Sequence, residues 1–408
     1  MSTKIPNRFD DVDWDEITDS SGFVLSINTK LMLVTSIPLL ALALYDWRLV
    51  GEREATFERL GEDLGVSGLF ETVGLNHDPS GLDYLFIFTI LLFLFYLLLP
   101  LYQNPRMTKY YWKEFKRNRP AVVSLGWLAI VFVGGLLGPL VMNPPETDIL
   151  IGYQPPVYMS TEMVHVPTCA GEIQDGRCYG TWEYPLGTSH DGQSVFTIIV
   201  YGMTISMQIA FIVTTIVAAI GITFGTVSAY AGGWVDEIMM RFVDIVLSLP
   251  TLLIYILILY IYGASLAMFI LVFAVIGWGG TARYVRSKAL SVSEEEFVKA
   301  TRISGASTFR TVRRHVVPNT ASSIITQLTL LIPIFLLAEA QLAFLGLGDS
   351  SIRSWGQLIS MGRSSLSYAP WIVLAPGIVL FLTILAFNFL GDALLDALNP
   401  EAEAEADK

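Results

Sequence analysis

Residues 294–319 read EEEFVKATRISGASTFRTVRRHVVPN and separate two apolar stretches of the chain. The stretch before them contains ASLAMFILVFAVIGW (264–278), and the stretch after them contains IITQLTLLIPIFLLA (324–338). Long apolar runs of this kind are typical of helices that cross a membrane. The charged, helix-prone segment between them is therefore expected to lie at a membrane surface, held by something outside the membrane.

The composition of the whole chain indicates the same class. Of 408 residues, 53% are apolar and 15% are charged, whereas a soluble protein carries about 25% charged residues. The formal net charge of −12 argues against nucleic-acid binding. The chain opens with the polar, acidic stretch MSTKIPNRFDDVDWDEITDS and has no cleavable secretory signal. We therefore expect an all-α polytopic protein of the cell membrane whose first residues stay in the cytosol.

Eight segments have the apolar length of about 20 residues that a bilayer crossing needs. Their loops predict the orientation, because lysine and arginine are enriched on the cytoplasmic side. The linker 103–120 and the loop 289–319 are basic, whereas the loop 143–195 is acidic with Arg177 as its one lysine or arginine. Eight spans then place both basic loops and both termini on the cytoplasmic side. The expected spans are 30–50, 83–102 and 121–142, segments within 195–231, 238–262 and 266–288, and finally 320–345 and 371–391.

The two cysteines of the chain, Cys169 and Cys178, lie together in the acidic outer loop. A disulfide between them is expected if that side of the membrane is oxidising, and two free thiols are the alternative. A zinc site is not expected, because two thiols supply half of a tetrahedral ligand set. No cofactor or metal is expected elsewhere in the chain.

The stretch 294–319 predicts two short helices with a joint between them. Ser293 can cap the first helix, with Glu296 at the capping-box position three residues later. Gly305 is a natural stop. Ser307 can cap the second helix, which is expected to end at Pro318, where the next span begins.

The first of these helices is expected to be amphipathic. Phe297, Ala300 and Ile303 form an apolar ridge with Lys299 and Arg302 beside it. Two explanations fit this pattern equally. The helix can lie on anionic lipid, or it can dock into a groove of a cytoplasmic partner.

The same loop resembles the EAA signature of permeases from ATP-binding cassette (ABC) importers, in the branch that carries dipeptides, oligopeptides or nickel. The likeness extends over about 116–400 and rests on many motifs in the same order. They are YPLGT (184–188), AYAGGWVDEIMMRFVDIVLSLP (229–250), GWGGTARYVRSKAL (277–290), EFVKATRISGAS (296–307), RRHVVPN (313–319), AEAQLAFLGLG (338–348), SWGQLISMGR (354–363) and PWIVLAPG to LAFNFLGDALLDALNP (370–400).

The resemblance implies a transport subunit with several partners. A homologous second permease subunit would enclose a path with this chain, two ABC ATPase subunits would dock at the cytoplasmic loops, and an extracellular solute-binding protein would deliver a peptide substrate. The resemblance implies that the chain is a transport subunit and not an enzyme, with ATP hydrolysis in the separate ATPase subunits. The chain contains no P-loop pattern GxxxxGK[ST], so it should not bind ATP by that route. The coupling residues implied by the signature are Glu296, Phe297, Lys299, Ala300, Thr301, Arg302, Gly305 and Ala306.

The sequence departs from the family pattern at two places. Lys299-Ala300-Thr301 stands where the family has Glu-Ala-Ala, and SHDGQS (189–194) replaces a DxxGRD-like run, which puts the outer partner contact in doubt. The expected organisation is an N-terminal extension with two spans (1–115), the first family helix (116–145), an extracellular loop (146–194), the permease core (195–400) with its coupling loop 289–319, and an acidic tail (401–408).

A few charged residues near or within spans are candidates for a path or gate. Glu237, Arg241 and Asp244 share one helical face, where they could steady an inner gate or the ATPase interface, or form ordinary helix pairs. Glu339 near the outer end of its span could line the path and meet a peptide amino terminus, or bond to a neighbouring helix. Arg283 and Arg286 are expected to snorkel to the cytoplasmic surface.

Three other functions stay open on the sequence alone. Nickel or another small solute is the alternative cargo, although the predicted spans contain no histidine or cysteine. An ion-coupled secondary transporter would need charges near the membrane midplane, and these are sparse here. A non-transporting scaffold or receptor would use the first 115 residues.

Overall fold

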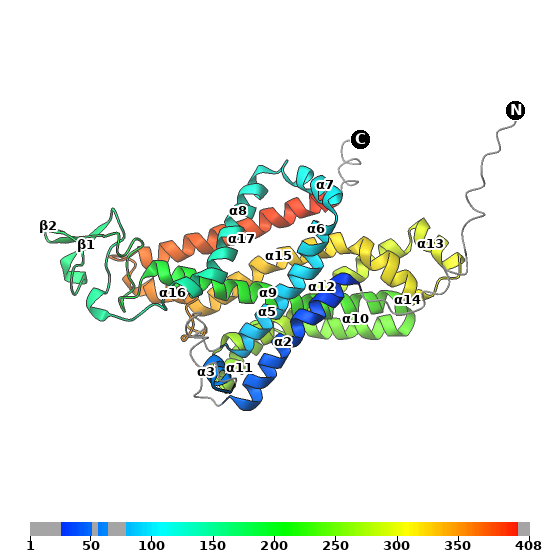
Figure 1. The fold of residues 1–408 in the computed structure, drawn as a ribbon, viewed down its shortest axis with the longest axis horizontal. Coiled ribbons are helices and arrows are strands. Elements are labelled where there is room, and N and C mark those ends of the chain that lie inside the picture. Colours follow the sequence, from blue (N-terminus) through cyan, green and yellow to red (C-terminus); the bar gives the residue numbers. More distant parts are fainter. Residues whose placement is uncertain (1–25, 51–55, 64–78, 399–408) are drawn as a thin grey trace.

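The computed structural model describes residues 26–50, 56–63 and 79–398, and these form a long bundle of helices with one small sheet (Figure 1). The sheet lies at one end of the bundle and the loop helices α13 and α14 lie at the other, which we call the sheet end and the α13 end (Figure 1). The longer helices are α2 (Ile27–Leu49), α5 (Gly81–Phe93), α7 (Pro105–Phe115), α8 (Arg119–Val141), α9 (Val195–Ala231), α10 (Gly233–Ser248), α11 (Thr251–Tyr262), α12 (Leu266–Ser293), α15 (Val317–Phe344) and α17 (Trp371–Leu398).

Short elements connect these helices. α5 continues through a π-helical turn (Leu94–Leu98) into α6, so the apolar helix runs over Gly81–Gln103. The other short elements are α3 (Thr56–Asp63), α6 (Leu99–Gln103), α13 (Glu296–Ile303), α14 (Thr308–Thr311), a π-helical turn (Val312–Val316), α16 (Trp355–Gly362), 3₁₀ turns at Ile149–Ile151, Met163–His165 and Arg363–Ser365, and the strands β1 (Ser160–Glu162), β2 (Ile173–Gln174) and β3 (Arg177–Tyr179).

The described residues contain seven helices long and apolar enough to cross a membrane, or eight if the bent pair α10–α11 is one span. The fold class is thus the polytopic all-α bundle that the composition predicts. The span expected within 238–262 is a bent one, because α10 and α11 meet at an angle of 67°. The break falls at Leu249 and Pro250, since proline disfavours helical geometry in the residue before it and lacks an N–H of its own.

The centre of the bundle is the contact between α9 and α12. Two glycines of α9 let the helices approach closely: a Cβ on Gly221 would lie 2.8 Å from the Thr281 side chain, and one on Gly225 would lie 2.5 Å from the Ala282 carbonyl oxygen. Side chains such as Val217, which is fully buried, fill the core around this contact. α9 and α12 therefore act as one rigid unit on which the other helices pack.

The N-terminal helices belong to the same body. α5 begins with a capping box between Ser80 and Asp83, and the Asp83 carboxylate also accepts a hydrogen bond of 2.8 Å from Gln208 of α9. The rings of Phe86 and Phe93 both pack against Phe211 of α9, with centroids 6.1 and 5.3 Å apart. α5 therefore packs directly on α9, and α2 is joined to the helix that continues α5 by hydrogen bonds between Thr29 and Tyr96 and from Gln103 to Asn28.

The loop between α8 and α9, which we call the outer domain after its expected position, contains a three-stranded sheet of order β1-β3-β2, with both pairs antiparallel. A disulfide joins Cys169 to Cys178, whose Cα atoms are 5.7 Å apart. The disulfide connects β3 to the segment that leads into β2. It therefore stabilises a small domain that lacks the size for a large hydrophobic core.

Two expectations about the stretch 294–319 are wrong. Ser293 does not cap a new helix: it is the last residue of α12, and its hydroxyl donates back to the Leu290 carbonyl. The second loop helix does not end at Pro318 either. It passes through the π-helical turn Val312–Val316 into α15, because the widened turn accommodates the missing N–H of this proline.

Candidate functional site

The inner side of α13 is fixed to the ends of three long helices. Val298 is fully buried and packs with Ala289 of α12 and Val316 of the π-helical turn before α15. Tyr230 near the end of α9 lies against the same small cluster. A displacement of α13 would therefore be transmitted to three long helices at once. The sequence analysis did not single out Val298. Its position directly after Phe297 places it about 100° around the helix from the predicted ridge, which is the signal that could have assigned it to a different face.

The opposite side of α13 is open. Phe297 is 44% exposed and Ile303 is 87% exposed, and Ala300 and Lys299 are exposed beside them. The structure thus places the described members of the predicted apolar ridge on the surface of the α13 end. An exposed phenylalanine and isoleucine outside the expected spans mark a surface that a partner or a lipid can cover.

The joint after α13 has the geometry of a glycine stop. Gly305 has φ +84°, a left-handed conformation that glycine adopts without a Cβ penalty. The Ala306 N–H donates to the Thr301 carbonyl at 3.3 Å, and the Ser307 hydroxyl accepts from the Arg310 N–H at 3.4 Å, which begins α14. The predicted stop at Gly305 and cap at Ser307 are therefore present.

Near the α13 loop, an ion pair joins α12 to α10. Arg286 donates two hydrogen bonds to the Asp236 carboxylate, at 2.6 and 2.5 Å. The Ser228 hydroxyl at the end of α9 donates to the same carboxylate. Only part of the Arg286 and Asp236 side chains is exposed, 32% and 19%, so solvent screens this ion pair incompletely. Arg286 thus pairs with an acidic residue of a neighbouring helix, a contact that the sequence did not predict.

The predicted trio on α10 is divided between two sets of partners. Glu237 and Arg241 form an i, i+4 pair at 3.1 Å with both side chains largely exposed. Asp244 instead pairs with Arg283 of α12. Two ion pairs, Asp236–Arg286 and Asp244–Arg283, therefore fasten α10 to α12. The Glu237–Arg241 pair lies within one helix and contributes only about 0.2–0.5 kcal/mol.

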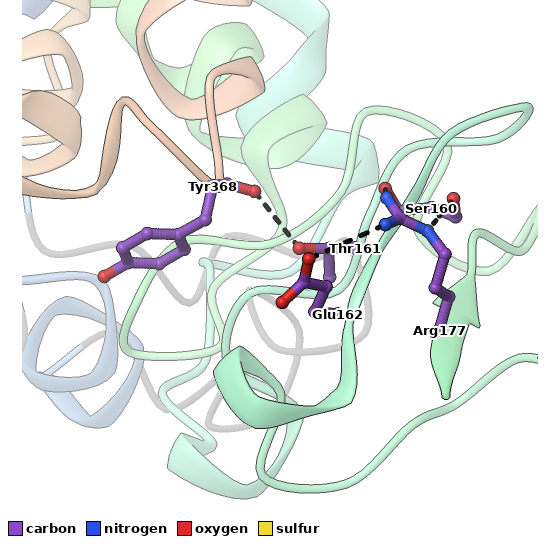
Figure 2. A network of polar contacts seen from close by, with 5 residues as sticks. All are labelled: Ser160, Thr161, Glu162, Arg177 and Tyr368. Carbon is purple, nitrogen blue, oxygen red and sulfur yellow. Dashed lines mark hydrogen bonds and ion pairs between the residues drawn. The ribbon is translucent and has the colours of Figure 1, made fainter. Parts of the chain in front are cut away.

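The outer domain is attached to the loop before α17. Figure 2 shows Thr161 of β1 donating to the Tyr368 carbonyl at 3.2 Å, while Arg177 of β3 donates to the Ser160 hydroxyl and carbonyl, each at 3.0 Å. The Arg177 guanidinium also lies 3.9 Å from Glu162. Arg177, the one lysine or arginine of the loop 143–195, thus stabilises the sheet.

Aromatic packing continues this attachment. The ring of Tyr368 stacks on His165 with centroids 4.1 Å apart and meets Tyr153 edge-on at 5.3 Å. Burial, together with the neighbouring Tyr368, raises the pKa of Tyr153 to about 12. Trp371 at the start of α17 donates to the Thr188 carbonyl at 3.1 Å. The outer domain is therefore anchored at several points around the sheet end.

Known proteins match most of the chain. A family model described as the inner membrane component of binding-protein-dependent transport systems matches residues 221–403, and one described as the N-terminal transmembrane domain of oligopeptide transport permease C matches residues 106–156. The dipeptide transport system permease protein of Bacillus subtilis (strain 168) is 35% identical over 292 residues, which cover 71% of this chain and 84% of the relative. The chain belongs to this family of ABC-importer permeases.

Other relatives agree with that assignment. The oligopeptide transport system permease protein of Escherichia coli (strain K12) is 31% identical over 290 residues, covering 71% of the permease and 89% of the relative. The oligopeptide transport system permease protein of Bacillus subtilis is 31% identical over 297 residues, with 71% and 90% covered. The family models leave residues 1–105 unmatched, so α2 and α5 lie outside them.

Glu339 is the acidic residue of the permease that lies within α15, toward the sheet end. It is half-buried, and its carboxylate interacts with the buried Ser354 that caps α16. Tyr255 of α11 lies within electrostatic range of Glu339 and donates its hydroxyl to the Leu347 carbonyl at 3.1 Å. Within the described ranges Glu339 forms no ion pair, and a carboxyl group at this depth in a helix bundle is costly and marks a candidate functional position.

The structure brings no metal site together. Within residues 26–50, 56–63 and 79–398, no three His, Cys, Asp or Glu side chains are grouped to hold an ion. The structure therefore divides the candidate residues into three regions: the loop around α13, the ion pairs between α10 and α12, and the Glu339 region near the sheet end.

Proposed function

We propose that the permease is the membrane-spanning subunit of an ATP-driven importer that carries dipeptides or oligopeptides across the cell membrane. The peptide cargo rests on the relatives, whose names describe dipeptide and oligopeptide transport systems. The observation that carries the proposal is the two-sided geometry of α13: Val298 is buried against three helices, while Phe297 and Ile303 are exposed.

Two ABC ATPase subunits would dock at the cytoplasmic loops, and one of them would bind the exposed side of α13. An exposed apolar ridge on a short helix is the form in which a helix docks into a partner's groove. Glu296, Lys299, Thr301, Arg302 and Ala306 would complete the contact, with Gly305 as its fixed joint. The α13 end is then cytoplasmic, both termini lie in the cytosol, and the acidic sheet end faces outward.

The remaining partners follow from the same arrangement. A homologous second permease subunit would enclose the path, and an extracellular solute-binding protein would dock at the sheet end. Closure of the ATPases upon ATP binding would shift α13 as a rigid body, and the Val298 cluster would pass that shift to α9, α12 and α15. The ion pairs Asp236–Arg286 and Asp244–Arg283 would carry it onward to α10, whose bend at Pro250 divides the moving half from α11.

The other candidate functions have less support. Nickel import is less well supported because the described long helices contain no histidine or cysteine that could bind the ion. An ion-coupled transporter would use paired charges near the midplane, whereas the ion pairs between α10 and α12 lie toward the α13 end.

Co-purification from mild detergent tests the proposal. The tagged permease should retain an ABC ATPase, and the double variant Phe297→Asp/Ile303→Asp should lose it while still inserting into the membrane. Glu237→Gln/Arg241→Gln, on an exposed face of α10, is the matched control and should retain the ATPase. Loss of the ATPase from neither or both variants would count against docking at α13.

A further inference from the structure

One face of α7 carries a row of positive charge. Arg106, Lys109, Lys113 and Lys116 follow one another at i, i+3, i+7 and i+10, the last being the C-cap residue of the helix. This spacing places all four on one side of a helix. All four side chains are exposed, and within the described ranges of the chain none of them forms an ion pair with an acidic residue.

The opposite side of α7 fixes its orientation. Phe115 is buried and packs with Ala121 of α8 and with Ala393 and Ala397 near the end of α17. The basic row therefore cannot turn inward, because the other face is held by the bundle. Arg117, which follows the row, differs from it: it forms an ion pair with Glu114 at 2.7 Å.

The position of α7 indicates what the basic row faces. The helix connects the end of the apolar helix Gly81–Gln103 with the start of α8, so it lies at a boundary of the expected bilayer. Exposed aromatic side chains surround it: Tyr102 is 84% exposed, and Tyr110 and Trp112 are also exposed. Tyrosine and tryptophan are enriched at this depth, where their rings reach both apolar and polar surroundings.

The charge of this face is opposite to that of the chain as a whole. The net charge of the chain is −12, whereas the four side chains of the row are all positive and attract an anionic surface. We propose that the face formed by Arg106, Lys109, Lys113 and Lys116 binds the anionic headgroups of the adjacent lipid leaflet. This contact holds α7, and with it the end of α17, at the membrane surface while the α13 loop moves.

The test uses the full-length chain in phosphatidylcholine nanodiscs. Met107→Cys on the apolar side of α7 is labelled with a fluorophore, since both native cysteines are in the disulfide. A minor fraction of lipid carries brominated acyl chains, either as phosphatidylglycerol or as phosphatidylcholine. We expect stronger quenching by brominated phosphatidylglycerol at equal mole fraction, which measures anionic lipid enrichment at α7.

Variants then separate charge from structure. Lys109→Gln and Lys113→Gln should each lower the enrichment, by up to about fivefold for each charge removed. Lys109→Arg should retain it, and Arg117→Gln should retain it because that charge is already paired. Equal quenching by the two brominated lipids in the unsubstituted chain would overturn the proposal.

Two further outcomes would also overturn it. If Arg117→Gln lowers enrichment as much as Lys109→Gln, the effect is not specific to the basic row. The second outcome concerns the acidic tail. If deletion of 401–408 makes the lipid enrichment of Lys109→Gln equal to that of the unsubstituted chain, the basic row binds an acidic segment of the chain and not lipid. Unchanged thermal unfolding of each variant shows that the fold is retained.

Discussion

Arg286 of α12 binds the Asp236 carboxylate of α10 through two hydrogen bonds, 50 residues apart in sequence. The pair lies between the α13 loop and the bend at Pro250. It therefore ties the helix that leads into the loop to the helix that bends in the middle of a span. If the loop receives motion from an ATPase, this pair is one of two ion pairs, with Asp244–Arg283, through which α10 follows.

Asp236→Asn should weaken this connection. The variant removes a charge-assisted interaction and should lower the free energy of unfolding by about 2 kcal/mol. It should also reduce peptide uptake per ATP hydrolysed in the reconstituted complex. The exchanged pair Asp236→Arg/Arg286→Asp should recover part of the lost coupling, because the attraction is restored. Glu237→Gln is the control and should change neither quantity. Equal loss in the single and exchanged variants would contradict a role for the ion pair.

Gly305→Leu should uncouple transport while leaving insertion intact. A leucine held at φ +84° costs about 1–2 kcal/mol, so the joint between α13 and α14 should shift. ATP-dependent peptide uptake is the readout, with membrane-inserted protein as the reference. Ser304→Ala at the neighbouring exposed position is the control. Normal uptake in Gly305→Leu would show that the joint is not needed.

The two sides of α13 should respond differently to truncation. Val298→Ala removes buried apolar surface and should loosen the helix by about 1.5 kcal/mol, which hydrogen exchange over 296–303 can measure. Phe297→Ala should leave that exchange unchanged and weaken ATPase binding. If Phe297→Ala increased exchange as much as Val298→Ala does, Phe297 would have a role in holding the helix to the bundle.

Glu339→Gln should distinguish a charge in the path from a structural hydrogen bond. Glutamine retains a polar side chain beside Ser354 but removes the charge. If Glu339 meets the amino terminus of the cargo, uptake of free peptides should fall by at least about tenfold, and uptake of N-acetylated peptides should not. A purely structural role would lower both equally. Failure of the unsubstituted complex to import any peptide would instead contradict the proposed cargo.

The long helices were predictable from the sequence because each needs a single local property, a continuous apolar run. The same holds for the stop at Gly305, whose left-handed geometry is a property of one residue. The break at Pro250 was only partly predictable: a proline inside a span disfavours a straight helix, but the 67° bend depends on packing around both halves.

The site was less predictable because its contacts join distant residues. Arg286 and Asp236 lie on different helices, with most of α10, all of α11 and most of α12 between them in the sequence. No local spacing therefore predicts their pairing. Asp244 was grouped with Arg241 by helical periodicity, yet Arg283 of another helix is its partner. Ser293 matched a capping pattern, but α12 continues through it, since tertiary packing of α12 extends beyond the apolar run.

The most direct test of the central claim is cross-linking from α13 to the ATPase. Both native cysteines are in the disulfide, so Ile303→Cys provides a single reactive thiol on the exposed side of α13. Asp396→Cys, exposed at the end of α17, is the control. Docking at α13 predicts that a short thiol-to-amine reagent joins Ile303→Cys, and not Asp396→Cys, to the ATPase, with a yield that depends on ATP. Cross-linking from Asp396→Cys alone, or equal yields from both positions, would contradict it.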